Sequence, residues 1–308
     1  MEQNELMNPK IDFVFKLLFG NEKDTSFLIS FLNAALDLSG EKAIKSVIIK
    51  NPVNDRQTED DKLSIMDVKA ETNDETVINI EIQLRDQHNM RERTLYHLSK
   101  MIAERLNKGE DYQKIAKTVT INILDFDLLG RETRFHSIFR FQDTVLNDEL
   151  TDAGEIHFME LPILRCYIEQ NKEDITNLIG KEKLLDWLLF IDNPDSEYAK
   201  LAENSDEVIG RAKDMLRTLS TDEKLREEYL AREKAIMDHY ASLKAAEKHG
   251  IEIGEARGIE MGKADGIEMG KIETAAQMLK DGMSIDLVCK YTGLSEKIIR
   301  QALKNDAL

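Results

Sequence analysis

The spacing of apolar residues in the first third of the chain predicts two helices followed by three strands. Between Pro9 and Leu38, apolar side chains recur every three or four residues, which is the spacing of one helix face, and Gly20 interrupts the run. Three β-rich stretches follow, at residues 47–49, 64–70 and 76–84. Because the polar residues 71–75 between the last two have turn chemistry, we expect an antiparallel hairpin there.

A long helix and three further strands complete the predicted core. The helix extends from about Met90 to Lys108, and Gly109 ends it. We expect its buried face to carry Leu95, Leu98, Ile102 and Leu106. The further strands are predicted at residues 119–124, 135–141 and 156–161. Strands and helices in this mixed order predict an α/β or α+β core that ends near Pro162.

The remainder of the chain has a helical, highly charged pattern, with its densest apolar patch at residues 184–190. A Gly-Ile-Glu repeat then places a glycine at every fourth position from Gly250 to Gly270. Glycine weakens a helix by about 1 kcal/mol relative to alanine. The repeat therefore indicates either a flexible linker or a helix that packs closely through its glycines, and we favour close packing in a dimer.

The C-terminal residues predict two short amphipathic helices on either side of Gly293, with Ser295 as the N-cap of the second. This is the outline of a helix-turn-helix, although a helical hairpin used for oligomerisation has the same pattern. We divide the chain into a core at 1–165, a helical extension at 166–249, a repeat segment at 250–273 and a short helical tail at 274–308.

Composition and charge narrow the class of protein. The formal net charge of −17 over 308 residues argues against a protein that coats nucleic acid by bulk electrostatics. No stretch reaches the roughly 18 uninterrupted apolar residues of a membrane helix. The acidic N-terminus does not resemble a secretory signal, and the two cysteines, Cys166 and Cys289, lie far apart. We therefore expect a cytoplasmic protein without a disulfide framework.

The predicted hairpin places polar side chains where a metal ion can bind. On its second strand, Asn79, Glu81 and Gln83 share one face, opposite three isoleucines. A turn centred near residues 73 and 74 pairs residue 67 with residue 80 or 81, which brings Asp67 close to Glu81. Two such carboxylates suit a hard cation such as Mg²⁺, and Gln83 is placed to position water or a phosphate. The same alternation also fits a strand whose polar face simply meets solvent.

Several motifs resemble those of known nucleases. Residues 65–68 and 79–83 are similar to the Asp…Glu-x-Lys/Gln signature of PD-(D/E)XK nucleases. The stretches at 12–20, 61–62, 93–96, 109–112, 121–124 and 156–161 resemble the Rpn family of recombination-promoting nucleases and transposase-like proteins. Together these motifs cover roughly residues 7–165 in the order of that family, and the Gly-Ile-Glu repeats are similar to those of many members.

The resemblance implies a restriction-endonuclease-like α/β fold, in which helices flank a mixed sheet and an all-helical region follows. It implies a Mg²⁺-dependent DNA endonuclease, with Mn²⁺ as a second suitable ion, acting in recombination or on transposon-like elements. Asp67 and Glu81 match the metal-binding acids of the family, and Gln83 matches the third catalytic position. Glutamine stands there instead of lysine, so charge stabilisation in the transition state must come from the metal or from elsewhere.

The sequence also indicates partners. Arg93, His97 and Lys100 lie at i, i+4 and i+7 of the long helix, with Arg91 nearby, and this strip fits the backbone of DNA without reading its sequence. A solvated helix face explains the same spacing. We expect a homodimer or higher homo-oligomer. The rival interpretation is a nuclease-fold protein of weak or no activity that works as an oligomeric interaction module.

Overall fold

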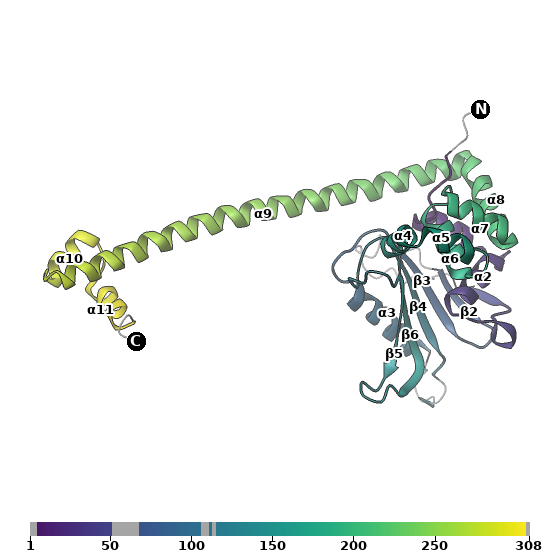
Figure 1. The fold of residues 1–308 in the computed structure, drawn as a ribbon, viewed down its shortest axis with the longest axis horizontal. Coiled ribbons are helices and arrows are strands. Elements are labelled where there is room, and N and C mark those ends of the chain that lie inside the picture. The colour runs from purple at the N-terminus through teal and green to yellow at the C-terminus, as the bar shows by residue number, and fades with distance from the viewer. Residues whose placement is uncertain (1–4, 51–67, 106–110, 113–114, 306–308) are drawn as a thin grey trace. The chain divides into compact units, whose positions relative to one another are not determined.

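A mixed sheet lies at the centre of the first of two units, Met1–Glu233 and Lys234–Leu308. The computed structural model describes residues 5–50, 68–105, 111–112 and 115–305. The six strands follow the order β1-β2-β3-β4-β6-β5 (Figure 1). They are β1 (Val47–Lys50), β2 (Val68–Thr72), β3 (Val77–Gln83), β4 (Thr118–Leu124), β5 (His136–Gln142) and β6 (Glu149–Glu160). β3, β4 and β6 are parallel neighbours, whereas β1, β2 and β5 pair antiparallel. The expected mixed sheet flanked by helices is confirmed.

The central strands are buried because both faces of the sheet are covered. All seven residues of β4 are buried, and so are the first five residues of β3. This is typical of parallel strands, whose crossover connections place helices over the sheet. Asn79 and Glu81 are among the buried residues, so the polar side of β3 does not simply meet solvent.

The hairpin of β2 and β3 has the expected turn. Val68 pairs with Ile80 and Glu71 pairs with Val77, and the polypeptide reverses direction through residues 73–74. The first part of the predicted strand, residues 64–67, lies outside the described residues and includes Asp67.

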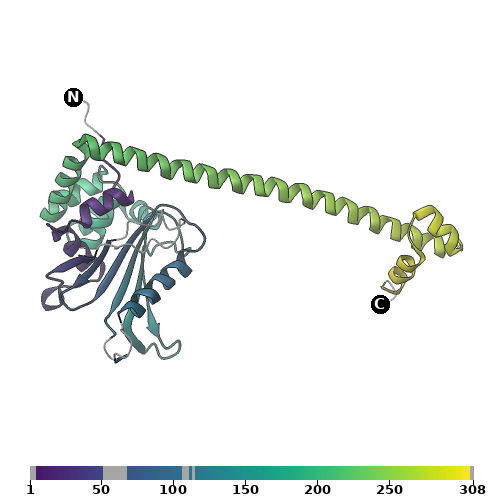
Figure 2. The same ribbon diagram turned by 180° about the vertical axis from the view of Figure 1, so that it is seen from behind.

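Helices from both ends of the first unit lie together beside the sheet (Figures 1 and 2). The helices are α1 (Asp12–Phe19), α2 (Ser26–Ala35), the 3-10 turn η1 (Gly40–Lys42), α3 (Met90–Glu104), α4 (Leu161–Gln170), α5 (Lys172–Leu178), α6 (Lys183–Asp192), α7 (Glu197–Ser205) and α8 (Glu207–Thr221). Trp187 on α6 is fully buried against Phe19 of α1 and Phe31 of α2, with ring centroids 5.3 and 6.4 Å away. The helices after the sheet therefore complete the core that the first two helices begin.

The buried face of α3 differs from the expected one. Leu98 is buried, as predicted, but Leu95 is half exposed. The buried residues are Met90, Thr94, Leu98 and Met101. The face is turned by one residue, or about 100°, because α3 packs a threonine against the sheet through a hydrogen bond to a buried asparagine. The prediction counted only apolar side chains. Leu106 and Gly109 lie outside the part of the chain that the structure describes.

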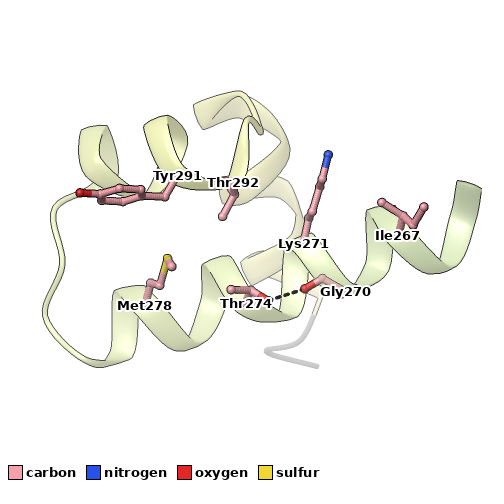
Figure 3. Close-up of a pocket in the computed structure, with 7 residues that line it drawn as sticks. All are labelled: Ile267, Gly270, Lys271, Thr274, Met278, Tyr291 and Thr292. Atoms are coloured by element: carbon pink, nitrogen blue, oxygen red, sulfur yellow. Dashed lines mark hydrogen bonds between the residues drawn. The ribbon is translucent and has the colours of Figure 1, made fainter.

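The second unit contains most of α9 (Glu223–Lys280), from Lys234 onwards, together with α10 (Ile285–Thr292) and α11 (Glu296–Asn305). Ala275, Val288, Leu294 and Ile299 form its small core. Gly293 links α10 to α11 with φ +71°, a left-handed conformation that glycine adopts without strain, and the Ser295 hydroxyl accepts a hydrogen bond from the Ile298 amide at 3.4 Å. A groove lies between α9 and α10, where Met278 and Tyr291 line opposite sides (Figure 3).

The Gly-Ile-Glu repeat lies within α9 and is helical. A Cβ atom added to any of its six glycines would meet no described atom outside its own helix within 4 Å. Within this chain, therefore, the glycines are not required by close packing. None of the described helices is long and apolar enough to span a membrane.

Candidate functional site

Strand β3 positions the two described residues of the predicted metal site. Its β-branched residues Ile78 and Ile80 are fully buried, and the alternation of the strand turns Glu81 and Gln83 to the opposite face. The carboxylate side chain of Glu81 is only 8% exposed. Gln83, at the end of the strand, is partly exposed. The strand thus ends with a buried acid beside an amide that reaches towards solvent.

Arg93 on α3 reaches both of these side chains. Its Nη2 atom forms an ion pair with Oε1 of Glu81 and donates to Oε1 of Gln83 at 3.2 Å. The Gln83 amide nitrogen donates in turn to the carbonyl of Arg85 at 3.3 Å. The Arg93 side chain is 18% exposed. One guanidinium therefore connects the acid and the amide of the predicted motif in a largely desolvated position.

A buried polar contact fixes α3 beside β3. Asn122 lies opposite Glu81 in the parallel register of β3 and β4. The Thr94 hydroxyl, one residue after Arg93, donates to Oδ1 of Asn122 at 3.3 Å, and Nδ2 of Asn122 donates to the carbonyl of His157 at 3.0 Å. Buried polar groups keep their place only when such bonds satisfy them. The contact therefore holds the start of α3, and with it Arg93, against the site.

Only part of the predicted metal site lies within the described residues. Asp67, the second predicted ligand, lies outside the described residues. Within the described ranges, no group of three His, Cys, Asp or Glu side chains is placed to hold a metal ion. The donors that are described, the Glu81 carboxylate and the Gln83 amide oxygen, are hard oxygen atoms. They suit Mg²⁺ or Mn²⁺ rather than a metal that prefers sulfur or imidazole.

The predicted basic strip does not present a uniform face. Arg93 turns inward to Glu81, whereas Arg91 and Lys100 are exposed. Nη2 of Arg91 donates to the carbonyl of Leu128 at 2.5 Å, and Nζ of Lys100 lies 3.9 Å from Oε1 of Glu104. His97 is partly buried, with its ring 5.6 Å from that of its neighbour Tyr96.

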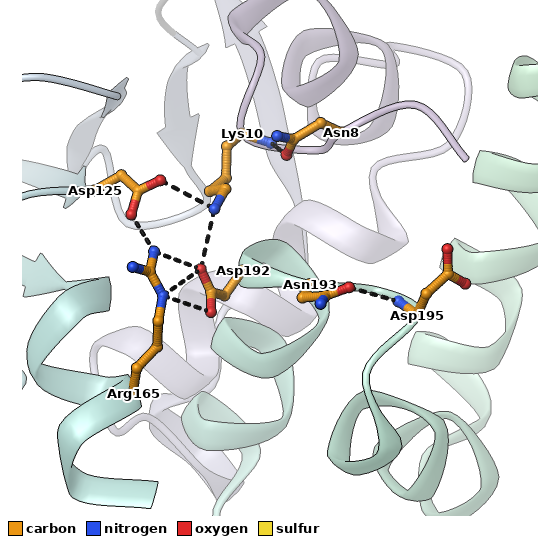
Figure 4. A network of polar contacts seen from close by, with 7 residues as sticks. All are labelled: Asn8, Lys10, Asp125, Arg165, Asp192, Asn193 and Asp195. Atoms are coloured by element: carbon orange, nitrogen blue, oxygen red, sulfur yellow. Dashed lines mark hydrogen bonds and ion pairs between the residues drawn. The ribbon is translucent and has the colours of Figure 1, made fainter. Parts of the chain in front are cut away.

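A charged network connects the ends of β3 and β4 to the helices (Figure 4). The Asp125 amide donates to the carbonyl of Gln83 at 2.9 Å, and the Asp125 carboxylate binds both Lys10 and Arg165. Asp192 on α6 binds the same two cations, with contacts of 3.1 Å to Lys10 and 2.9 Å to Arg165. Hydrogen bonding to Asp192 raises the pKa of Arg165 above its ordinary value. The network anchors the strand ends next to the site.

A second chain of titratable side chains runs through β5 and β6. The ring nitrogens of His136 and His157 are hydrogen-bonded at 2.8 Å, and His157 binds Glu155 at 2.6 Å. Burial lowers the pKa of His136 to about 4, and the neighbouring charges of His157 and Arg134 act in the same direction. Burial acts to raise the pKa of Glu155, but hydrogen bonds from His157, Arg140 and Lys117 outweigh it and hold that pKa well below its usual range.

Comparison with known families decides how the site is to be interpreted. A family model described as PD-(D/E)XK nuclease family transposase matches residues 9–246. The chain belongs to this family. Neither curated proteins nor solved structures gave a significant match. Family membership confirms the resemblance that the motifs carry. The matched region extends beyond the sheet to α8 and the first part of α9.

In this member of the PD-(D/E)XK nuclease family transposases, Glu81 and Gln83 share one face of β3 as the alternation predicts, but the sequence does not predict their contact with Arg93. It placed Arg93 on an outward strip, because helical spacing alone does not show which way a long side chain turns. It did not single out Asn122. Its position between two isoleucines in a predicted buried strand is the sequence feature that indicates a buried polar contact.

Proposed function

We propose that this chain is a Mg²⁺-dependent DNA endonuclease, also able to use Mn²⁺, that acts in recombination or on transposon-like elements. The observation that carries the proposal is the buried carboxylate of Glu81, held beside Gln83 and Arg93 in a chain of a nuclease family. Burying a charged group is costly, so a strand that served only as scaffold would be more stable with an apolar residue at this position.

Asp67 and Glu81 are the proposed metal ligands, and Gln83 is the third catalytic residue. Asp67 directly precedes Val68, whose partner on β3 is Ile80, the neighbour of Glu81. A divalent cation held by these acids would supply positive charge at the scissile phosphate and make water more acidic. Gln83 is hydrogen-bonded on both sides, to Arg93 and to the Arg85 carbonyl, so its amide is held in one orientation beside Glu81.

DNA is the proposed substrate, and the exposed side of α3 is the proposed contact with its backbone. Lys100 is exposed there and His97, three residues before it, lies on the same side. Arg91 is also exposed, but it lies nine residues before Lys100 and so about 180° around the helix, near the start of α3. With a net charge of −17, the protein needs local cations to approach DNA, and phosphate contacts of this kind carry no sequence information. Arg93 belongs to the same helix but acts deeper in the site.

Self-association through α9 is part of the proposal. Ile251, Ile259 and Ile267 are more than half exposed on this helix, and helices of this kind bury apolar side chains against a partner. Light scattering coupled to size exclusion would compare the full chain with one truncated after Lys248. We expect the truncated chain to be monomeric; an unchanged dimer would show that the residues after Lys248, which include the glycine repeat of α9, do not make the contact.

An interaction protein without catalytic activity is the alternative. The acidic composition and the exposed apolar residues of α9 favour it, because both suit assembly with protein partners better than contact with DNA.

Plasmid cleavage with Mg²⁺ or Mn²⁺ tests the proposed function. We expect metal-dependent nicking by the unaltered protein, and its loss in Asp67→Ala and in Glu81→Ala. Glu203→Ala is the matched control, because this carboxylate on α7 also pairs with an arginine but lies in the helical layer. Thermal melts would show that each variant is folded. A folded, metal-loaded protein that leaves the plasmid intact would favour the interaction protein.

A further inference from the structure

The catalytic motif of this chain lacks a cation where it is expected. The third position holds Gln83, whose amide has no charge to stabilise the negative charge that builds up on a phosphate under attack. Donors aimed at developing charge usually make the largest single contribution to catalysis. A nuclease with glutamine here must take this stabilisation from the metal ion or from a cationic side chain on another element.

Arg93 brings a positive charge to this position from α3. Its Nη2 atom contacts both motif residues, as an ion pair with Glu81 and as a hydrogen-bond donor to Oε1 of Gln83 at 3.2 Å. The guanidinium thus lies beside the side chain that replaces lysine. Its planar fork of five N–H donors matches the oxygens of a phosphate better than the single ammonium of lysine does.

The surroundings of Arg93 hold its charge in place and away from water. The side chain is 18% exposed, and electrostatic interactions are stronger in such partly desolvated positions than at the surface. The next residue, Thr94, is buried and bonded to Asn122 on β4, and Leu98 is buried one turn later. The backbone that carries Arg93 is therefore fixed relative to Glu81 before any substrate binds, which is the preorganisation that catalysis by charge requires.

We propose that Arg93 is a catalytic residue that takes the part of the missing lysine by contacting a non-bridging oxygen of the scissile phosphate. This inference rests on the proposed nuclease function. In the reaction, the oxygen of water forms a bond to phosphorus while one bridging P–O bond breaks, and the bond electrons leave with the departing oxygen. One proton of the water ends on that alcohol and the other on the new phosphomonoester or in solvent. Arg93 neutralises the charge on the phosphate throughout and exchanges no proton.

Cleavage rates of four variants test the assignment. We expect Arg93→Gln, which keeps a hydrogen-bonding group without the charge, to lose at least about 100-fold in rate, and Arg93→Ala to lose as much. Adding Gln83→Lys to Arg93→Ala should restore at least tenfold, because it returns a cation to the motif. Arg217→Ala, which removes an ion pair with Glu203, is the matched control and should stay within about twofold.

A binding measurement without metal separates a phosphate contact from a structural role. Fluorescence anisotropy of a short duplex in EDTA would follow affinity against salt concentration. If Arg93 touches phosphate, the slope of log affinity against log salt should fall by about 0.9 in Arg93→Gln and stay unchanged in Arg217→Ala.

Three results would overturn the assignment. The first is an Arg93→Gln variant within threefold of the unaltered rate, and the second is a variant that cleaves faster, which would make Arg93 an inhibitory clamp on Glu81. The third is a folded, inactive variant with no rescue by Gln83→Lys and no change in salt slope, which would leave Arg93 as a support for Glu81. If the unaltered protein does not cleave, the proposed function fails, while the salt slope still decides whether Arg93 binds phosphate.

Discussion

Replacing Trp187 by alanine should unfold the first unit at a much lower temperature. The indole is fully buried on α6, and its ring lies 5.3 Å from Phe19, 6.4 Å from Phe31 and 6.0 Å from Phe190. Its Nε1 atom donates to the hydroxyl of Ser30 at 3.1 Å. This one side chain therefore joins a helix that follows the sheet to the two helices that precede it.

The expected loss follows from the size of the cavity that alanine leaves. Substitution of a buried tryptophan or phenylalanine by alanine costs about 3–5 kcal/mol. For a unit the size of Met1–Glu233, each kcal/mol lowers the melting temperature by about 2–4 °C. Trp187→Ala should therefore melt about 6–20 °C below the unaltered protein, measured by circular dichroism at 222 nm.

Two further variants divide this loss between packing and hydrogen bonding. Trp187→Phe keeps an aromatic ring and should lose only about 1–2 kcal/mol. Ser30→Ala removes only the bond to the indole and should lose about 1 kcal/mol. Trp187 is the single tryptophan of the chain, so its fluorescence reports directly on Ser30→Ala. A Trp187→Ala protein that melts within about 1 °C of the unaltered one would refute the shared core.

The other predictions concern pH, the glycine repeat and the charged network. Because the pKa of His136 is about 4 when folded and about 6.5 when unfolded, the unfolded chain binds more protons between these values. The free energy of unfolding, measured in urea, should therefore fall by about 2–3 kcal/mol from pH 7 to pH 4, and by less in His136→Asn. Gly258→Ala with Gly266→Ala should make α9 more stable, by about 1 kcal/mol each, with a stronger helical signal at 222 nm. Asp192→Ala should cost about 2 kcal/mol in urea unfolding, because it removes one of the two carboxylates that bind the largely buried Lys10 and the more exposed Arg165.

Each of these predictions has a matched control. His249→Gln alters an exposed histidine on α9 and should leave the pH dependence unchanged. Gly293→Ala should destabilise the second unit, because φ is +71° there. If this substitution stabilised the unit, a gain in the repeat could not be attributed to the helical conformation of its glycines. Asp214→Ala removes an exposed ion pair with Arg217 and should change stability by less than about 0.5 kcal/mol. An equal loss of unfolding free energy in Asp192→Ala and Asp214→Ala would mean that the charged network stabilises the protein no more than an exposed ion pair does.

Much of the core could be predicted from local pattern. The helices on either side of Gly20, the hairpin of β2 and β3 and the strands β4 and β5 lie where apolar spacing places them, whereas β6 begins at Glu149, seven residues before its predicted start. These elements follow from periodicity because a strand alternates its faces and a helix repeats every 3.6 residues, whatever lies around them. The position of Glu81 and Gln83 on one face of β3 follows from the same rule.

Only the tertiary structure decided what those side chains meet. Arg93 is twelve residues after Glu81, and no local rule says that it turns inward to the acid rather than outward to solvent. Leu95 was misplaced for a related reason, since Thr94 takes the buried position through a bond to Asn122 on another strand. Likewise, the contact of Trp187 with Phe19 joins residues 168 positions apart. Period and turn chemistry act over a few neighbours, whereas long side chains choose their partners by packing and charge between elements that are distant in the sequence.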